Sequence, residues 1–76
     1  MQPYKNLSGD SGVAFYENGP DYIKVQFKDN KTYVYTRRSV GFVHLAEMQR
    51  LAGSGMGLNT YINSHSEVKN GYESKY

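Results

Sequence analysis

The segment from Tyr22 to Lys28 alternates strictly between apolar and polar residues, and this pattern limits the possible folds more than any other feature. Its apolar side chains share one face of an extended strand, and its polar side chains share the other. A strand of this kind buries one face and leaves the other in water, as in an antiparallel sheet. The apolar positions are Ile23, Val25 and Phe27.

Turn signals stand on both sides of this strand. Asn18-Gly19-Pro20-Asp21 precedes it and Asp29-Asn30 follows it, and residues of these types favour tight turns. Beyond the turns lie a short apolar run, Val13 to Tyr16, and a segment from Lys31 to Arg37. Three short strands at about ten-residue spacing predict an antiparallel meander. In its third strand, Tyr33 and Tyr35 share a face that we expect to point to the core.

Two helical stretches follow the strands. Ser39 is a suitable N-cap for a helix that runs to about Ala52. A second helix is expected from Leu58 to Val68, before Asn70-Gly71. The expected fold is α+β: a small three-stranded antiparallel meander packed against two C-terminal helices. The first helix would bury Phe42, Leu45, Met48 or Gln49, and Ala52, and the second would bury Leu58, Ile62 or Tyr61, His65 and Val68.

The chain has 76 residues and no cysteine, which excludes disulfides and thiolate metal sites. Its two histidines, His44 and His65, are too few for a zinc site without thiolates. Because so small a domain has a thin margin of stability, we expect additional support from self-association as a homo-oligomer. The predicted organisation is a polar N-terminal arm at 1–12 with Leu7 docked, one domain at 13–69, and a polar tail at 70–76.

The net charge of +2 is far from that of a polybasic nucleic-acid arm. No apolar run approaches the ~20 residues that span a bilayer, so no membrane partner is expected. The first 20 residues lack the pattern of a signal peptide. These observations predict a cytoplasmic protein, in the host cytoplasm if a phage encodes it.

The stretch from about Val13 to Ile62 resembles the KTSC domain, a small module named after the C-terminus of some lysyl-tRNA synthetases. The resemblance rests on a strand that ends in Phe27, a Tyr33-Val34-Tyr35 strand, a small-residue loop at Gly53-Ser54-Gly55, and Asn59-Thr60-Tyr61-Ile62. The family's Val-Pro is replaced near Arg38-Ser39, and the first helix is longer by about a turn. The resemblance implies the fold. Single-domain members in bacteria and phages imply accessory or host-defence-blocking roles.

The loop Gly53-Ser54-Gly55-Met56-Gly57 is the main candidate for a ligand site. Three glycines let the backbone approach a ligand closely, and the helical N-terminus that follows favours an anion. Three interpretations stay open: a phosphate cradle, a tight helix–helix turn, and a contact for a neighbouring subunit. Neither a Walker A motif nor a dinucleotide fingerprint is present.

Other candidate residues would complete this site. Arg37 or Arg38 would pair with phosphate, Tyr61 would stack on a ring, and Asn59 would contact the ligand or cap the second helix. Ordinary solvated charge and core packing are the alternatives for these side chains. A His44–Glu47 acid–base pair is conceivable from their spacing of three residues, but no nucleophile has a recognisable context.

The sequence therefore predicts a non-enzymatic protein without a cofactor. The expected ligand is a small phosphate-bearing molecule, a nucleotide or cyclic nucleotide signal, and a phage protein that sequesters a host-defence messenger is one version. Two alternatives stay open. The first is a protein–protein interaction module, such as a phage inhibitor of a host defence enzyme, and the second is a binder of single-stranded nucleic acid.

Overall fold

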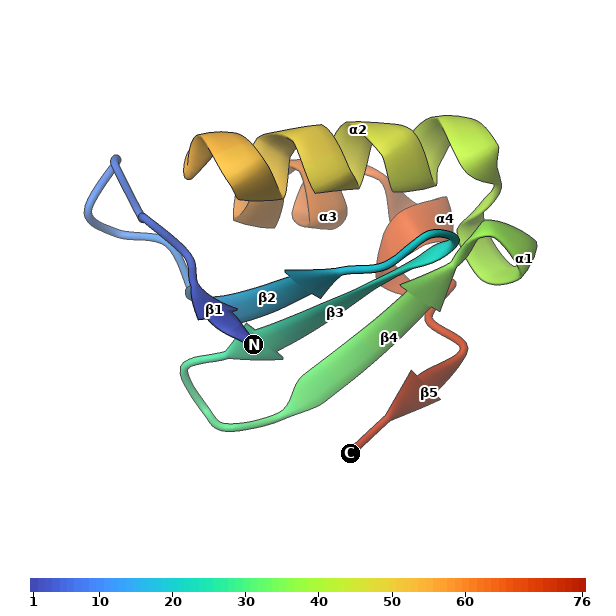
Figure 1. Cartoon of the computed structure of the whole chain (residues 1–76), viewed down its shortest axis with the longest axis horizontal. Coiled ribbons are helices and arrows are strands. Elements are labelled where there is room, and N and C mark those ends of the chain that lie inside the picture. The colour runs from blue at the N-terminus through green and yellow to red at the C-terminus, as the bar shows by residue number, and fades with distance from the viewer.

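The computed structural model describes residues 1–76 and has an α+β fold, as the sequence predicts. A five-stranded antiparallel sheet in the order β1-β2-β3-β4-β5 forms one layer, and α2 and α3 lie above one of its faces (Figure 1). None of the helices is both long and apolar enough to cross a membrane. The strands are β1 (Gln2–Pro3), β2 (Val13–Asn18), β3 (Tyr22–Phe27), β4 (Thr32–Thr36) and β5 (Ser74–Lys75). The helices are α1 (Arg37–Val40), α2 (Phe42–Ser54), α3 (Leu58–Ser64) and α4 (Ser66–Lys69).

The predicted meander is confirmed as β2, β3 and β4. Its turns lie at the two predicted sequences, and Asn30 adopts the left-handed conformation, with φ of 71°. In the β3–β4 pairing, Ile23 lies opposite Tyr35 and Val25 lies opposite Tyr33. Tyr35 is buried, and Tyr33 packs against the core from its edge, so both face the side that the sequence indicates.

A β-bulge changes the alternation of β2. Val13 pairs with Phe27 and Phe15 pairs with Gln26, so the intervening Ala14 is the extra residue on this strand. Beyond the bulge, even-numbered residues of β2 face the core in place of odd-numbered ones. Tyr16 is therefore buried, whereas Phe15 is exposed on the other face of the sheet.

The predicted arm and tail each supply an edge strand, which corrects the count from three strands to five. β1 pairs with β2, and β5 pairs with β4. The docked residue of the arm is Tyr4, which is 6% exposed, and not Leu7, which is 61% exposed. Strands of two residues have no periodicity that a sequence pattern can reveal.

The first predicted helix is two helices, α1 and α2, and it begins earlier than expected. The N-cap is Thr36, whose Oγ1 accepts a hydrogen bond from the N–H of Ser39 at 3.0 Å. Ser39 completes a capping box, because its Oγ accepts from the N–H of Thr36 at 3.0 Å. The break lies at Gly41, where φ is 88°. Ser39 is thus the third residue of α1 and not its cap.

The second predicted helix is also divided, into α3 and α4. The division lies at His65, whose φ of −123° and ψ of 96° are extended rather than helical. The helix count is therefore four rather than two. Both short helices still direct apolar residues into the core, and these are Leu58, Ile62 and Val68.

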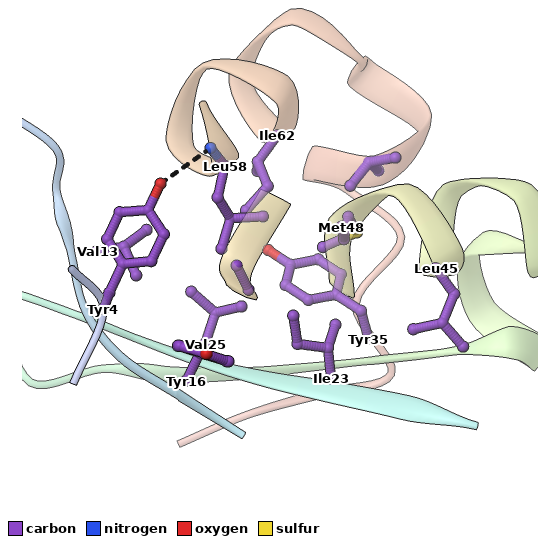
Figure 2. Close-up of a cluster of buried hydrophobic side chains, with 12 residues drawn as sticks. Tyr4, Val13, Tyr16, Ile23, Val25, Tyr35, Leu45, Met48, Leu58 and Ile62 are labelled. Carbon is purple, nitrogen blue, oxygen red and sulfur yellow. Dashed lines mark hydrogen bonds between the residues drawn. The ribbon is translucent and has the colours of Figure 1, made fainter. Parts of the chain in front are cut away.

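The core lies between the helices and one face of the sheet (Figure 2). From α2 it takes Leu45, Met48 and Ala52, which resolves the choice between Met48 and Gln49. Phe42 is 63% exposed, so its predicted burial is wrong. The amide of Gln49 instead donates to the carbonyl oxygens of Gly19 and Tyr22, each at 2.9 Å, which ties α2 to the β2–β3 turn.

Candidate functional site

A groove of about 540 Å³ opens between the β3–β4 turn, α3 and the segment after α4. We call it the tyrosine groove. Its aromatic lining comes from β3, β4 and the C-terminal segment. Its polar lining comes from the β3–β4 turn, α3, and the end of α4. The aromatic residues are Phe27, Tyr33, Tyr35 and Tyr72. The polar residues are Lys28, Asp29, Asn59, Asn63, Lys69 and Asn70, and Gly12 and Ile62 complete the lining.

Three aromatic rings form a wall of the tyrosine groove. Tyr33 packs edge-to-face against Phe27, with ring centroids 5.3 Å apart. It packs in the same way against Tyr72, at 5.0 Å. Because each edge-to-face contact restrains both of its rings, the wall presents fixed planar surfaces before any ligand arrives.

Tyr35 lies at the buried side of the tyrosine groove. Its side chain is only 1% exposed and its hydroxyl forms no hydrogen bond within the chain. Since no fully buried polar side-chain atom lacks a partner, the hydroxyl keeps contact with solvent in the groove. Burial, and the neighbouring Tyr33 and Tyr72, raise the pKa of Tyr35 far above its usual value, so the phenol keeps its proton. Because this hydroxyl has no partner within the chain, it can both donate to and accept from a polar group that enters the groove.

Two lysines and three asparagines form the polar side of the tyrosine groove. Neither Lys28 nor Lys69 forms a salt bridge, although Asp29 also lines the groove. Asn63 donates to the backbone oxygen of Asn59 at 3.0 Å and to its Oδ1 at 3.3 Å, which orders two of the amides. The two lysines and one aspartate give the lining a net charge of +1.

Lys75 adds positive charge beside the wall. Its Nζ lies 5.4 Å from the ring centroid of Tyr33 and 5.8 Å from that of Tyr72, distances at which cation–π attraction operates. This residue belongs to β5, so the pairing of β5 with β4 brings a third lysine to the aromatic wall. The combination of planar rings, amides and lysines can bind a molecule with an aromatic ring and an anionic group.

The glycine-rich loop is a helix–helix turn covered by the N-terminal segment. Gly55 has φ of 79° and ends α2, and its carbonyl accepts the N–H of Leu7 at 2.8 Å. A Cβ on Gly55 would lie 2.5 Å from the Cβ of Lys5. The N–H of Leu58, which begins α3, donates to the Tyr4 hydroxyl at 3.3 Å. These contacts favour the turn over the phosphate cradle.

The other residues of the loop have similar local roles. Gly53 and Ser54 are the last residues of α2, and the Ser54 hydroxyl donates to the carbonyl of Leu51 at 2.9 Å. Gly57 precedes α3 with φ of 88°, and Met56 is exposed. None of the five lines the tyrosine groove.

Arg37 and Arg38 lie at the opposite end of α2 from the glycine-rich loop. They begin α1 directly after β4, and the 13 residues of α2 separate them from the loop by about 20 Å. The Arg37 guanidinium lies over the Phe42 ring, 5.4 Å from its centroid. Arg38 lines a shallow depression on the exposed face of the sheet. The predicted site that combines arginines and loop therefore does not form.

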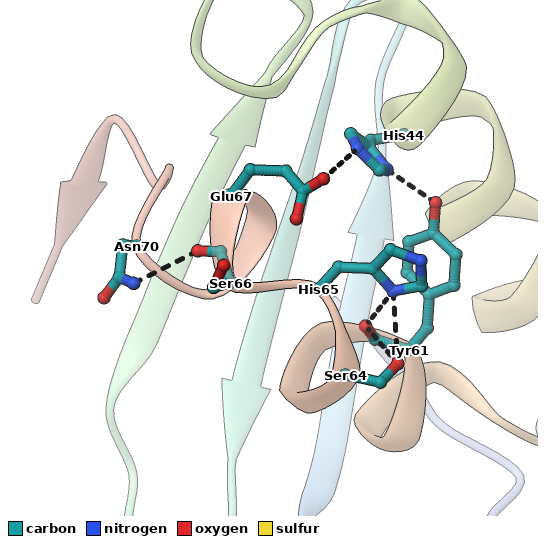
Figure 3. Close-up of polar contacts among 7 residues, drawn as sticks. All are labelled: His44, Tyr61, Ser64, His65, Ser66, Glu67 and Asn70. Carbon is teal, nitrogen blue, oxygen red and sulfur yellow. Dashed lines mark hydrogen bonds and ion pairs between the residues drawn. The ribbon is translucent and has the colours of Figure 1, made fainter.

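Tyr61 belongs to a polar cluster between α2, α3 and α4 (Figure 3). Its hydroxyl lies 2.6 Å from Nδ1 of His44, and its ring stacks on His65 with centroids 4.1 Å apart. Nε2 of His44 lies 3.5 Å from Oε2 of Glu67. Glu47 instead accepts from Nε of Arg50 at 2.9 Å, so the considered His44–Glu47 pair is wrong.

The pKa shifts of Tyr61 and Glu67 are those expected of side chains that hold the helices together. Burial and the carboxylates of Glu47 and Glu67 raise the pKa of Tyr61 above its usual value. A hydrogen bond from its own backbone N–H, and the charges of His44 and His65, lower the pKa of Glu67. Tyr61 therefore keeps its proton, and its hydroxyl forms a hydrogen bond with Nδ1 of His44. Of the nine predicted site residues, Asn59 alone lines the tyrosine groove.

Most residues of the tyrosine groove escaped the sequence analysis. Asn59 and Asn63 are four residues apart and share a face of α3, which was a usable signal. Tyr72 and Lys75 offered none, because the segment after Gly71 has the composition of a tail. No family model, curated protein or solved structure matches the chain, so the description of this site depends on its geometry.

Proposed function

We propose that this protein is a non-catalytic binding protein, and that the tyrosine groove takes a small ligand with a planar ring and a phosphate group, such as a nucleotide. The observation that carries the proposal is the Tyr35 hydroxyl, which reaches solvent only in the groove and has no hydrogen-bond partner within the chain. A polar atom of the ligand would replace solvent at this hydroxyl. The proposal keeps the ligand class expected from the sequence and moves the site.

The surroundings of Tyr35 support both parts of the ligand. Tyr33 and Tyr72 line the groove with aromatic surface against which a base can pack, and base–aromatic stacking is worth about 1–3 kcal/mol per base. Asn59 and Asn63 offer amide groups that recognise base edges or hydroxyls. Lys28 and Lys69 have no carboxylate partner and are suited to a phosphate.

The absence of catalysis is part of the proposal, and the pairing of the ionisable groups supports it. His44 bonds to Tyr61 and faces Glu67, whereas Glu47 is held by Arg50. None of these side chains lines the tyrosine groove. Membership of the KTSC family and sequestration of a nucleotide signal in an infected cell remain proposals that rest on the sequence resemblance.

Single-stranded nucleic acid on the exposed face of the sheet is the weaker alternative. The depression on this face contains Lys24 and Arg38, but Asp21 and Glu73 share it. Two carboxylates beside two cations leave no net positive charge to attract a phosphate backbone. The charges of the tyrosine groove favour a phosphate ligand more clearly.

Titration followed by amide NMR tests the proposal on the wild-type chain. The probes are AMP, GMP, a cyclic mononucleotide and a cyclic dinucleotide, each compared with its nucleoside. We expect at least one nucleotide to shift the amides around Phe27, Asn63 and Tyr72, with smaller shifts for the nucleoside. Shifts confined to Gly53–Gly57 and Arg38 would contradict the groove, and an unchanged spectrum with every probe would contradict the ligand class.

A further inference from the structure

The outer face of α2, which points away from the core, consists of Phe42, Val43, Ala46, Glu47, Arg50 and Gly53. Two of its residues are among the most exposed apolar side chains of the chain: Phe42 is 63% exposed and Val43 is 77% exposed. Both precede the first buried residue of the helix, Leu45. Two large apolar side chains exposed side by side on one helix are candidates for a contact with another protein.

The outer face of α2 is bulky at one end and small at the other. Phe42 and Val43 stand at its N-terminal end. At its C-terminal end, nothing lies within 4 Å of the position that a Cβ on Gly53 would take. Beyond Gly53, Met56 is 52% exposed and Leu7 is 61% exposed. The N–H of Leu7 donates to Gly55, and the loop after β1 stands beside this end of α2 (Figure 1).

The middle of the outer face carries one charge of each sign. Glu47 and Arg50 lie one turn apart and form a salt bridge within the helix. If two such helices pack antiparallel, the acidic residue of each lies against the basic residue of the other. Along this face, large apolar residues are followed by a charged pair and then by small residues. Two copies in opposite directions therefore place large residues against small ones and opposite charges against each other.

We propose that a second copy of this chain packs antiparallel on the outer face of α2, across a two-fold axis between Met48 and Gln49. Glu47 of each copy then meets Arg50 of the other. Phe42 and Val43 of each copy then lie opposite Gly55 and Ser54 of the other, between Gly53 and Met56, because the axis exchanges the two ends. One patch serves both subunits, as a closed two-fold interface requires.

The dimer interface and the tyrosine groove are separate. No residue of α2 lines the groove, so dimerisation and ligand binding are tested independently. The contact extends over a helix of about 20 Å and the apolar pairs at its ends. This is smaller than a standard interface of about 800 Å² per partner, so we expect a weak dimer.

Sedimentation of the full chain at concentrations up to about 1 mM measures the association. We expect a concentration-dependent shift from monomer to dimer. In Gly53→Leu, the new side chain has open space in the monomer but lies within one turn of the position where the partner's Val43 would pack. We expect this variant to stay monomeric with an unchanged or raised Tm, since leucine favours a helix over glycine.

A charge exchange tests the antiparallel arrangement. Glu47→Arg places two cations on each helix and Arg50→Glu places two anions, so each variant alone is expected to be monomeric. An equimolar mixture restores the opposite charges and is expected to dimerise, whereas Lys24→Glu on the exposed sheet face leaves the wild-type association unchanged. A wild-type monomer at the highest concentration, or variants that dimerise as the wild type does, would overturn the proposal.

Discussion

The hydroxyl of Tyr61 and Nδ1 of His44 lie 2.6 Å apart, and this contact joins α3 to α2. Tyr61 keeps its proton, and we assign its hydroxyl as the donor of this hydrogen bond. His44 then carries its own proton on Nε2, which faces Glu67 of α4 at 3.5 Å. One hydrogen bond therefore sets the tautomer through which His44 also holds α4.

Tyr61→Phe removes this hydrogen bond and keeps the ring that stacks on His65. We expect a loss of about 1 kcal/mol in the free energy of unfolding, because Nδ1 of His44 loses its partner. Urea denaturation measures the loss, and nitrogen NMR of the imidazole reports a mixture of tautomers. Tyr72→Phe is the control, since it removes a phenol hydroxyl outside the His44 contact and keeps a ring that packs against Tyr33. Unchanged stability together with an unchanged tautomer would contradict the assignment.

The Glu67 carboxylate makes the stability depend on acid pH. Its pKa in the folded chain is lowered, first by a hydrogen bond from its own N–H and also by His44 and His65. The unfolded value is about 4.3, so the stabilisation is present above that pH and is lost as the pH falls through the lower folded value. Glu67→Gln should flatten the loss of stability as the pH falls below about 4.3. Denaturation curves with the same acid slope in both proteins would contradict this role.

Tyr35 makes the stability depend on alkaline pH in the opposite sense. Its pKa is raised in the folded chain, so its stabilisation is present below the unfolded pKa of about 10 and is lost as the pH rises above that value. At neutral pH, Tyr35→Phe should change the stability by less than about 0.5 kcal/mol, because the hydroxyl has no partner to lose. The variant should also resist alkaline unfolding better than the wild type. A loss above about 1 kcal/mol at pH 7 would contradict an unpartnered hydroxyl.

The central meander could be predicted from the sequence because its signals are local. The alternation of Ile23, Val25 and Phe27 fixes one strand, and the flanking turn residues place its neighbours. The edge strands at Gln2–Pro3 and Ser74–Lys75 could not be predicted, since each is held by pairing with a distant segment. The helix break at Gly41 was visible only as a residue of low helix propensity.

The candidate site was harder to predict, because it depends on tertiary structure. Arg38 and Gly55 are plausible phosphate ligands by residue type, but α2 holds them at opposite ends. Lys5 packs where a ligand of Gly55 would sit. The groove instead joins Phe27, Asn63 and Tyr72, which are distant in sequence. Asn59 was found because its position at the start of a helix singled it out.

Substitution by alanine should destabilise the chain at Gly55 and stabilise it at Gly53. Gly55→Ala places a Cβ at φ of 79° and against Lys5, so we expect a loss of about 1–2 kcal/mol in stability. Gly53→Ala adds a side chain in open space within α2, and we expect a gain of up to about 1 kcal/mol. Thermal denaturation compares the two. Nucleotide affinity should stay the same in both folded variants, and a selective loss in Gly55→Ala would return the site to the loop.

The measurement that tests the central claim most directly is a thermal-shift titration of four proteins with the nucleotide panel. They are the wild type, Tyr35→Phe, the double variant Lys28→Ala/Lys69→Ala, and Arg38→Ala as a matched cation control. At about 100 times its Kd, a ligand adds about 2.7 kcal/mol to the stability of the folded state. We predict a Tm rise for the wild type and Arg38→Ala, a smaller rise for Tyr35→Phe, and none for the double variant. A rise that survives in the double variant but disappears in Arg38→Ala would contradict the tyrosine groove as the ligand site.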